Sequence, residues 1–297
     1  MNHPKISIIT PSYNQGQFIE ETIKSVLNQN YPNLEYIIID GGSTDKSVEI
    51  IKKYENHLKF WVSEKDTGQA NAINKGLKYC TGEIFNWLNS DDYLELGALQ
   101  KIKTAFEDNK IQMVAGKVRI FETETEEIVQ NQNLSAKGLM CWEKHVKFVQ
   151  PGVWLRRDLV NTCGGIDESY HFAFDWDLYI RYLYHFSEVK EIPEILVHFR
   201  LHGDSKTESL SHKFSDEERM VIKKISNLSK YSGLHKACNY KIQKTNWTNF
   251  LAQQSISNTS FLQKCFAVAR EMSHFNEVSM SRQTAGAIKA FWKGKKI

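Results

Sequence analysis

The segment I-F-N-W-L-N-S-D-D, residues 84–92, runs from mostly apolar side chains directly into two aspartates, Asp91 and Asp92. A short apolar run bounded by polar residues is typical of a buried strand. Two adjacent carboxylates at the end of such a strand repel each other and lose hydration. The segment therefore predicts a buried strand whose end needs a compensating partner for Asp91 and Asp92.

Strands and helices alternate around this segment. Apolar and β-branched runs predict strands at 5–10, 34–40, 60–63 and 83–89. Apolar residues at helical spacing predict helices over 17–29, after Ser43, around 70–77 and over 97–108. This alternation predicts an α/β fold with a mostly parallel sheet covered by helices on both faces. Ligands bind such sheets beyond the carboxyl ends of the strands, so Asp40 and the pair Asp91/Asp92 are expected to be neighbours there.

The rest of the chain is less regular. Residues 110–205 predict a hairpin (113–121 with 127–130), strands at 148–155 and 188–200, and a helix over 175–184. Residues 206–297 carry helix-like patterns without a repeat. The predicted organisation is therefore a domain over 1–205, divided into halves 1–109 and 110–205, followed by a mainly helical region over 206–297.

Composition bounds the class of protein. The 297 residues are 41% hydrophobic, enough for a sizeable core, yet no apolar window of about 18 residues predicts a transmembrane helix. The first residues lack the pattern of a signal peptide, so the chain is expected to stay in the cytoplasm. Five scattered cysteines without a C-x-x-C motif predict reduced, mostly buried thiols rather than a zinc site.

Charge is distributed unevenly along the chain. Residues 1–205 carry 22 Lys and Arg against 29 Asp and Glu, whereas residues 206–297 carry 16 against 6. The C-terminal stretch 287–297 combines Ile, Phe and Trp with four lysines. This pattern predicts either an interfacial helix on the inner face of an anionic membrane or a solvated tail.

Asp91 and Asp92 are the first candidates for chemistry. Aspartate also favours turns and helix N-caps, so a structural role is the alternative. At the binding edge of a parallel sheet, however, the two carboxylates are suitable ligands for Mg²⁺ or Mn²⁺, which typically uses one or two carboxylates and phosphate oxygens. The doublet therefore predicts a substrate that carries a diphosphate.

Asp40 follows another apolar strand. It could cap the turn that follows, or accept hydrogen bonds from a ribose or base, and Gly41 lets a ligand approach the backbone. The chain contains neither G-x-G-x-x-G nor G-x-x-x-x-G-K-[ST], which disfavours dinucleotide-binding and P-loop folds.

The segment F-A-F-D-W-D-L-Y-I-R, residues 172–181, offers a candidate base. Asp177 and Arg181 have the spacing of a structural i,i+4 pair. Asp175 could be a helix N-cap, but its large apolar neighbours suit a general base, because an apolar setting raises a carboxylate pKa.

The segment H-F-R-L-H-G-D-S-K-T, residues 198–207, offers positive charge. His202 could be an ordinary core or surface histidine, or it could ligate the metal or touch a phosphate. Arg200 and Lys206 could neutralise a leaving diphosphate.

Taken in order, four motifs in residues 4–205 resemble the family 2 glycosyltransferases, inverting enzymes with the GT-A nucleotide-diphospho-sugar transferase fold. They are T-P-S-Y-N with the downstream I-I-I-D-G-G-S-T-D, D-T-G-Q-A-N-A-I-N-K-G, N-S-D-D in place of the D-x-D motif, and F-D-W-D-L-Y-I-R. The sequence departs from the family pattern at Asn89, at Phe174 and at Ile73, where an Asp, a Glu and an Arg are common.

The resemblance implies roles for individual residues. Asp175 would be the catalytic base. Asp91, Asp92 and His202 would lie at a Mn²⁺ or Mg²⁺ ion. The nucleotide sugar would be bound by Pro11, Tyr13, Asn14, Asp40, Gly41, Asp66, Asn71, Lys75, Asn89, Ser90, Asp91 and Arg200.

The expected function is therefore transfer of a sugar from a nucleotide-diphosphate donor, expected to be a UDP-sugar, to a hydroxyl acceptor. The resemblance implies bacterial surface polysaccharide (capsule, O-antigen or exopolysaccharide) as the product, and a saccharide or lipid-linked saccharide as the acceptor; no nucleic acid is expected as partner. Two alternatives stay open: a sugar nucleotidyltransferase, which would normally carry a basic, Gly-rich loop after the first strand, and a non-catalytic relative that binds nucleotide sugars.

Overall fold

The computed structural model describes residues 3–122, 125–203, 211–257, 259–272, 274–275, 289 and 291–292. The chain divides into two compact units, Met1–Glu217 and Glu218–Ile297. Of the predicted boundary near Gly203–Ser209, only Gly203 is described. Lys206 and most of the stretch 287–297 lie outside the described residues.

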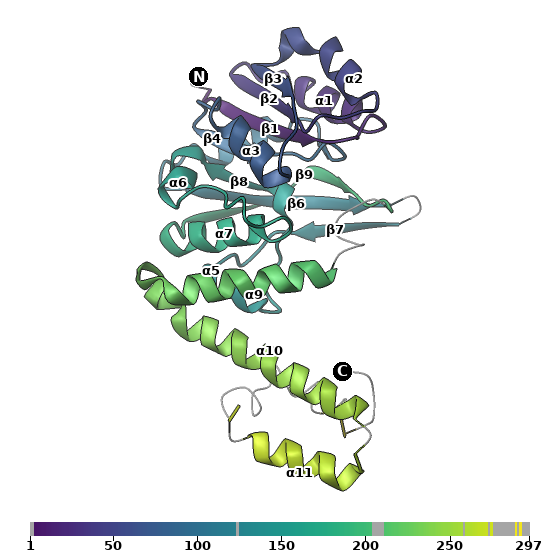
Figure 1. Ribbon diagram of the computed structural model, residues 1–297. Coiled ribbons are helices and arrows are strands. Elements are labelled where there is room, and N and C mark those ends of the chain that lie inside the picture. Colours follow the sequence, from purple (N-terminus) through teal and green to yellow (C-terminus); the bar gives the residue numbers. More distant parts are fainter. Residues whose placement is uncertain are drawn as a thin grey trace. The chain divides into compact units, whose positions relative to one another are not determined.

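A nine-stranded sheet forms the centre of the first unit, in the order β3-β2-β1-β4-β8-β6-β9-β5, with β7 paired to β6 (Figure 1). Its strands are β1 (Ile6–Ser12), β2 (Leu34–Asp40), β3 (Phe60–Ser63), β4 (Ile84–Trp87), β5 (Tyr93–Leu94), β6 (Met113–Phe121), β7 (Glu126–Gln130), β8 (Val153–Arg156) and β9 (Val189–Arg200). The first four strands pair in parallel, as the sequence predicts. Antiparallel β8 joins this half to β6, β7 and β9.

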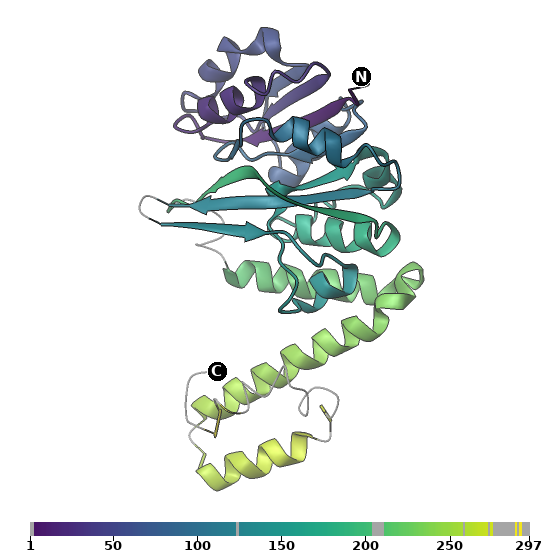
Figure 2. The ribbon, with the colours of Figure 1, turned by 180° about the vertical axis from the view of Figure 1, so that it is seen from behind.

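Helices cover both faces of the sheet, because the central strands carry apolar side chains on both faces. One face packs against α1 (Ile19–Leu27), α2 (Ser47–Lys53) and α4 (Ala98–Ala105), with Ile8 and Ile38 in the shared core. The other face packs against α3 (Gln69–Leu77) and α7 (Phe174–His185). Figures 1 and 2 show these two groups of helices on opposite sides. The predicted α/β architecture is confirmed.

The second half of the sheet is more irregular than its sequence suggests. The predicted hairpin is present as β6 and β7, and the predicted helix 175–184 as α7. The predicted strand 148–155 is wrong in its first part. Residues Gln150–Gly152 form a short 3-10 turn (η2), because Pro151 has no backbone N–H for a strand ladder, and only Val153–Arg156 pairs as β8. The short helices α5 (Ala136–Cys141) and α6 (Arg157–Thr162) complete this half.

The C-terminal part is helical, as the sequence predicts. Its elements are α9 (Ser211–Asn227), η3 (Ser229–Leu234), α10 (His235–Ile256) and α11 (Phe261–Met272). One further 3-10 turn, η1 (Glu55–His57), lies in the first half of the chain, between α2 and β3. Trp247, Leu251, Val268 and Phe291 form a small core of the second unit. All five cysteines are free and four are buried. No helix among the described residues is long and apolar enough to span a membrane.

Candidate active site

The carboxyl ends of β1, β2 and β3 lie in register, with Ser12 beside Asp40 and Asp40 beside Ser63. The Asp40 side chain is fully buried, and its Oδ2 accepts hydrogen bonds from the Gly42 and Ser43 N–H groups and the Ser63 hydroxyl at 3.1, 2.9 and 2.6 Å. Asp40 therefore stabilises the turn after β2, the structural role that the sequence left open. Because β1 lies between β2 and β4, Asp40 is separated by roughly 10 Å, two strand spacings, from β4, the strand that precedes Asp91 and Asp92.

The loop after β3 lies directly against this turn. A Cβ atom on Gly41 would approach Oδ2 of Asp66 to 2.8 Å, so only glycine allows the Asp66 carboxylate to lie here. Oδ1 of Asp66 accepts the Gly68 N–H at 2.8 Å. Directly after β1, Tyr13 is 60% exposed and Asn14 has a left-handed backbone. These predicted nucleotide-binding residues thus follow the carboxyl ends of three neighbouring strands.

Asp91 and Asp92, for which the sequence predicted compensating partners, have different ones. Oδ2 of Asp91 lies 3.0 Å from Nε2 of His202. Asp92 is buried; its Oδ1 accepts the Arg200 N–H at 3.0 Å and its Oδ2 the Asn89 side-chain amide at 3.3 Å. Burial, and after it the charge of Asp91, raises the pKa of Asp92 well above its usual range. Asp91 is therefore the more available carboxylate, and Asp92 supports the loop.

Arg200 reinforces the same loop instead of extending a free guanidinium. Its Nε donates to the Asp91 carbonyl oxygen at 3.1 Å, and its Nη2 pairs with Glu21 on α1. The guanidinium also lies over the rings of Phe18 and Phe121, 5.0 and 4.8 Å from their centroids. These contacts favour a bracing role for Arg200; binding of the nucleotide sugar stays a prediction.

Helix α3 borders the site with amide side chains. Gln69, which the sequence reading missed, donates through Nε2 to Oδ1 of Asn89 at 2.6 Å. Asn71 donates to Glu168 at 2.7 Å, and Lys75 lies 2.6 Å from Oε1 of Glu64.

Two further predicted site residues lie outside α3 and are buried. The carbonyl oxygen of Ser90 accepts the Thr22 hydroxyl at 2.9 Å, and Pro11 lies within β1. The polar groups of Gln69, Asn71, Lys75 and Ser90 named above therefore all have hydrogen-bond partners within the chain.

Asp175 lies in the first turn of α7, where its Oδ1 accepts the Trp176 N–H at 2.6 Å. The N-cap position belongs to Ala173, so Asp175 is not the N-cap that was the structural alternative. The neighbouring Phe174 packs its ring 6.1 Å from Trp87, the last residue of β4. This packing brings the start of α7 to the strand that precedes Asp91.

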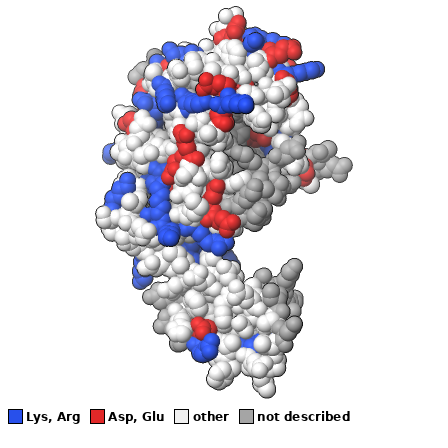
Figure 3. Space-filling model, in the orientation of Figure 1, with Lys and Arg blue, Asp and Glu red and all other residues white. Residues whose placement is uncertain are grey.

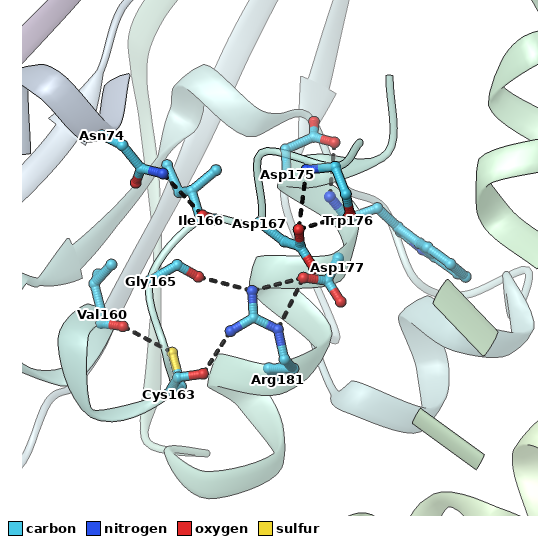
Figure 4. A network of polar contacts seen from close by, with 11 residues as sticks. Asn74, Val160, Cys163, Gly165, Ile166, Asp167, Asp175, Trp176, Asp177 and Arg181 are labelled. Atoms are coloured by element: carbon cyan, nitrogen blue, oxygen red, sulfur yellow. Dashed lines mark hydrogen bonds and ion pairs between the residues drawn. The ribbon is translucent and has the colours of Figure 1, made fainter. Parts of the chain in front are cut away.

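Asp177 and Arg181 form the structural pair that their spacing predicts (Figure 4). Both side chains are almost completely buried, with Nη2 of Arg181 2.6 Å from Oδ2 of Asp177. Arg181 also donates to the carbonyl oxygens of Cys163 and Gly165, in the loop before α7. In the same loop, Ile166 accepts a hydrogen bond from Asn74 of α3 at 2.9 Å (Figure 4). The network fixes α7, and with it the position of Asp175.

Asp91 and His202 are the residues best suited to a divalent cation. Within the part of the chain that the structure describes, no three His, Cys, Asp or Glu side chains gather as a ready-made metal cluster. A carboxylate combined with substrate phosphates is, however, a usual ligand set for Mg²⁺, and the Asp91 and His202 side chains are 21% and 15% exposed. The donor set therefore fits a cation shared with a diphosphate ligand.

Comparison with known proteins identifies relatives. A family model, Glycosyl transferase family 2, matches residues 7–166. A glycosyltransferase of Haemophilus influenzae is 37% identical over 131 residues, which cover 43% of this chain and 52% of that protein. Chondroitin synthase of Escherichia coli is 28% identical over 246 residues, which cover 78% of this chain and 34% of the synthase. The matches thus span about half of the first relative and about a third of the second.

Solved structures of glycosyltransferases share the fold. S. aureus TarS 1–349 in complex with UDP-GlcNAc aligns with a TM-score of 0.65 at 16% identity, covering 98% of this chain and 81% of that chain. The mannosyltransferase PcManGT of Pyrobaculum calidifontis, in complex with GDP-Man and Mn²⁺, aligns with a TM-score of 0.61 at 16% identity, covering 99% and 86%. These likenesses confirm the predicted GT-A fold.

Proposed function

Because the chain belongs to glycosyl transferase family 2, we propose that it is an inverting glycosyltransferase that moves a sugar from a nucleotide-diphosphate donor to a hydroxyl acceptor. A UDP-sugar is the proposed donor, supported by the UDP-GlcNAc complex of TarS. Synthesis of a bacterial surface polysaccharide is the proposed context, supported by the relative named chondroitin synthase. Family membership disfavours the alternative of a sugar nucleotidyltransferase.

One observation carries the proposal: Phe174 packs against Trp87, and Asp91 and His202 pair at the loop just after Trp87. These contacts support the proposal that a base on α7 and a diphosphate site after β4 act on one substrate. Proximity of this kind is what a transfer reaction between two bound molecules requires.

The proposed chemistry has one proton transfer and one displacement. The Asp175 carboxylate accepts the proton of the acceptor hydroxyl. The acceptor oxygen forms a bond to C1 of the donor sugar, and the bond between C1 and the diphosphate oxygen breaks on the opposite face, so the configuration at C1 inverts. The nucleoside diphosphate leaves with the bonding electron pair.

Asp91 and His202 would hold the divalent cation of this site. When bound, Mn²⁺ or Mg²⁺ supplies positive charge beside the leaving diphosphate. Asp92 and Arg200 would keep the Asp91 loop in place through the hydrogen bonds described above. The complex of PcManGT with GDP-Man and Mn²⁺ supports a metal-dependent reaction.

We also propose that the second unit contacts an anionic membrane. Helix α11 exposes Phe261, Leu262 and Phe266 by 63%, 79% and 76%. Exposed apolar residues on one helix are suited to insertion between lipid headgroups. Residues 218–297 carry 14 Lys and Arg against 3 Asp and Glu, which complements anionic lipid. The drawn face of this unit has few charged atoms (Figure 3), as an inserting surface requires.

The activity is tested by incubating the full-length protein and Mn²⁺ with a panel of UDP- and GDP-sugars and measuring nucleoside diphosphate release. One or two donors that are hydrolysed above background, and not without Mn²⁺, are the expected result. Binding of UDP without turnover of any donor, in the presence of crude bacterial acceptor, would favour the non-catalytic alternative.

A further inference from the structure

The turn before Asp175 has an unusual support. Helix α7 begins without a capping side chain of its own, since its N-cap residue is Ala173. Instead, the carboxylate of Glu217, from α9, accepts three backbone N–H groups: those of His171, Phe172 and Ala173, at 2.8, 2.7 and 2.8 Å. A charged acceptor at a helix N-terminus satisfies otherwise unpaired N–H groups and interacts favourably with the helix dipole.

A second side chain of α9 holds the other side of Asp175. Phe214 is three residues before Glu217 and therefore lies on the same face of the helix. Its ring centroid is 6.3 Å from those of Trp176 and Trp142, and the two tryptophan rings stack at 5.8 Å. Glu217 thus fixes the His171–Ala173 turn two residues before Asp175, and Phe214 packs against Trp176, the residue that follows it. Figures 1 and 2 both show the first part of α9 beside α7.

The turn held by Glu217 also reaches the donor side. Gly68 has φ of 126°, and a Cβ atom there would lie 3.2 Å from Nδ1 of His171. Gly68 donates its N–H to Asp66, which packs against Gly41. A displacement of the His171–Ala173 turn would therefore move the base relative to the loops that border the donor. Misplacing a reacting group by about 1 Å can cost about 100-fold in rate.

We propose that Glu217 is a positioning residue for the transfer reaction: it fixes the His171–Ala173 turn and thereby holds Asp175 at the acceptor hydroxyl. The inference rests on the proposed function, because it assigns Glu217 an effect that passes through the catalytic base. Glu217→Gln removes the charge and replaces one of the two acceptor oxygens by an NH2 donor that faces backbone N–H groups, without touching the residues around Asp91.

The test compares Glu217→Gln and the charge-retaining Glu217→Asp with Asp216→Asn, a matched control that removes a carboxylate from the adjacent position of α9. Turnover is measured as UDP release with the donor found in the panel, binding as UDP titration with Mn²⁺, and folding as the Tm. For Glu217→Gln we expect kcat to fall about tenfold or more while UDP affinity changes less than about twofold. Glu217→Asp should be intermediate, and Asp216→Asn should match the wild type.

A double variant separates positioning from general support of the structure. If Glu217 acts through Asp175, Glu217→Gln should add less than about a twofold loss in the Asp175→Asn background. An equal loss in both backgrounds overturns the inference, as does wild-type kcat in Glu217→Gln when Asp175→Asn is impaired. Wild-type turnover of Asp175→Asn itself would instead contradict the proposed base. If Glu217→Gln does not fold, the same cycle is measured with Glu217→Asp.

Discussion

Nε2 of His202 lies 3.0 Å from Oδ2 of Asp91, although the two residues are 111 positions apart in the sequence. The contact joins the segment after β9 to the loop after β4 and brings together two side chains that could both ligate a metal ion. If this pair holds the cation, its two members should depend on each other in metal binding.

We therefore expect His202→Ala to weaken Mn²⁺-dependent UDP binding by about tenfold or more, about 1.4 kcal/mol. Titration calorimetry of UDP with and without Mn²⁺ measures the effect. His198→Ala is the matched control, because His198 lies on β9, four residues before His202, and pairs with Glu95 at 2.8 Å. Equal UDP affinities for His202→Ala and the wild type in Mn²⁺ would remove His202 from the metal site.

Asp175→Asn should lower kcat by about 10²–10⁴-fold, the usual contribution of a general base, because an amide cannot accept the acceptor proton. UDP binding should be unchanged, since the side chain is not among the proposed ligands of the nucleotide. Steady-state release of UDP gives the first quantity and calorimetry the second. Near-normal turnover with the true acceptor would refute the assignment of the base.

Asp177→Ala should act on stability, in contrast to its neighbour Asp175. The change leaves the buried Arg181 guanidinium without its carboxylate, which typically costs about 3–5 kcal/mol. The expected result is a lower free energy of unfolding in urea. Replacing the exposed Asp158 on α6 by Ala serves as control, with an expected change within about 0.5 kcal/mol. A stable Asp177→Ala protein that has lost turnover would place Asp177 in the chemistry instead.

The lowered pKa of Glu35 leads us to expect a loss of stability in acid. Burial alone would raise the Glu35 pKa, but hydrogen bonds from Thr81, Ser7 and Lys5 outweigh it and lower the pKa from 4.5 to about 2. A lowered carboxyl pKa stabilises the fold above about pH 4.5, and this contribution, at most about 3 kcal/mol, is lost as the pH falls toward 2. Urea unfolding of the wild type and Glu35→Gln at pH 7 and pH 3 measures it. The variant should lose less stability between these pH values than the wild type.

Membrane contact predicts that the wild type sediments with vesicles that contain phosphatidylglycerol and much less with pure phosphatidylcholine. Leu262→Ser combined with Phe266→Ser should reduce binding by about tenfold or more, because each buried apolar side chain contributes about 1.5–3 kcal/mol. Leu96→Ser removes a similarly exposed leucine (72% against 79% for Leu262) from the first unit and is the control. Equal sedimentation of the double variant and the wild type would reject α11 as the inserting surface.

The local pattern of the sequence was sufficient for most of the fold. Strand β4 and the helices around it follow from apolar periodicity, because periodicity reports which face of an element is buried. The i,i+4 spacing likewise identified the Asp177–Arg181 pair, since both residues belong to one helix. The strand predicted at 148–155 was wrong in its first part, because Pro151 cannot donate to the strand ladder. The proline is visible in the sequence, but the prediction followed the apolar pattern around it.

Contacts between distant segments could not be read in the same way. Glu217 is more than 40 residues from the turn that it supports, and no spacing rule connects them. Gln69 and Asn89 belong to different elements, and their hydrogen bond depends on how α3 packs on the sheet.

The sequence by itself determined the alternating order of strands and helices, the polar residues at the strand ends, and the family to which these motifs belong. Only the tertiary structure decided that Asp91 pairs with His202 while Asp92 is buried against the Arg200 backbone. The physical reason is that periodicity encodes burial within one element, whereas the partner of a carboxylate is decided by which distant backbone and side-chain groups packing brings within hydrogen-bond distance.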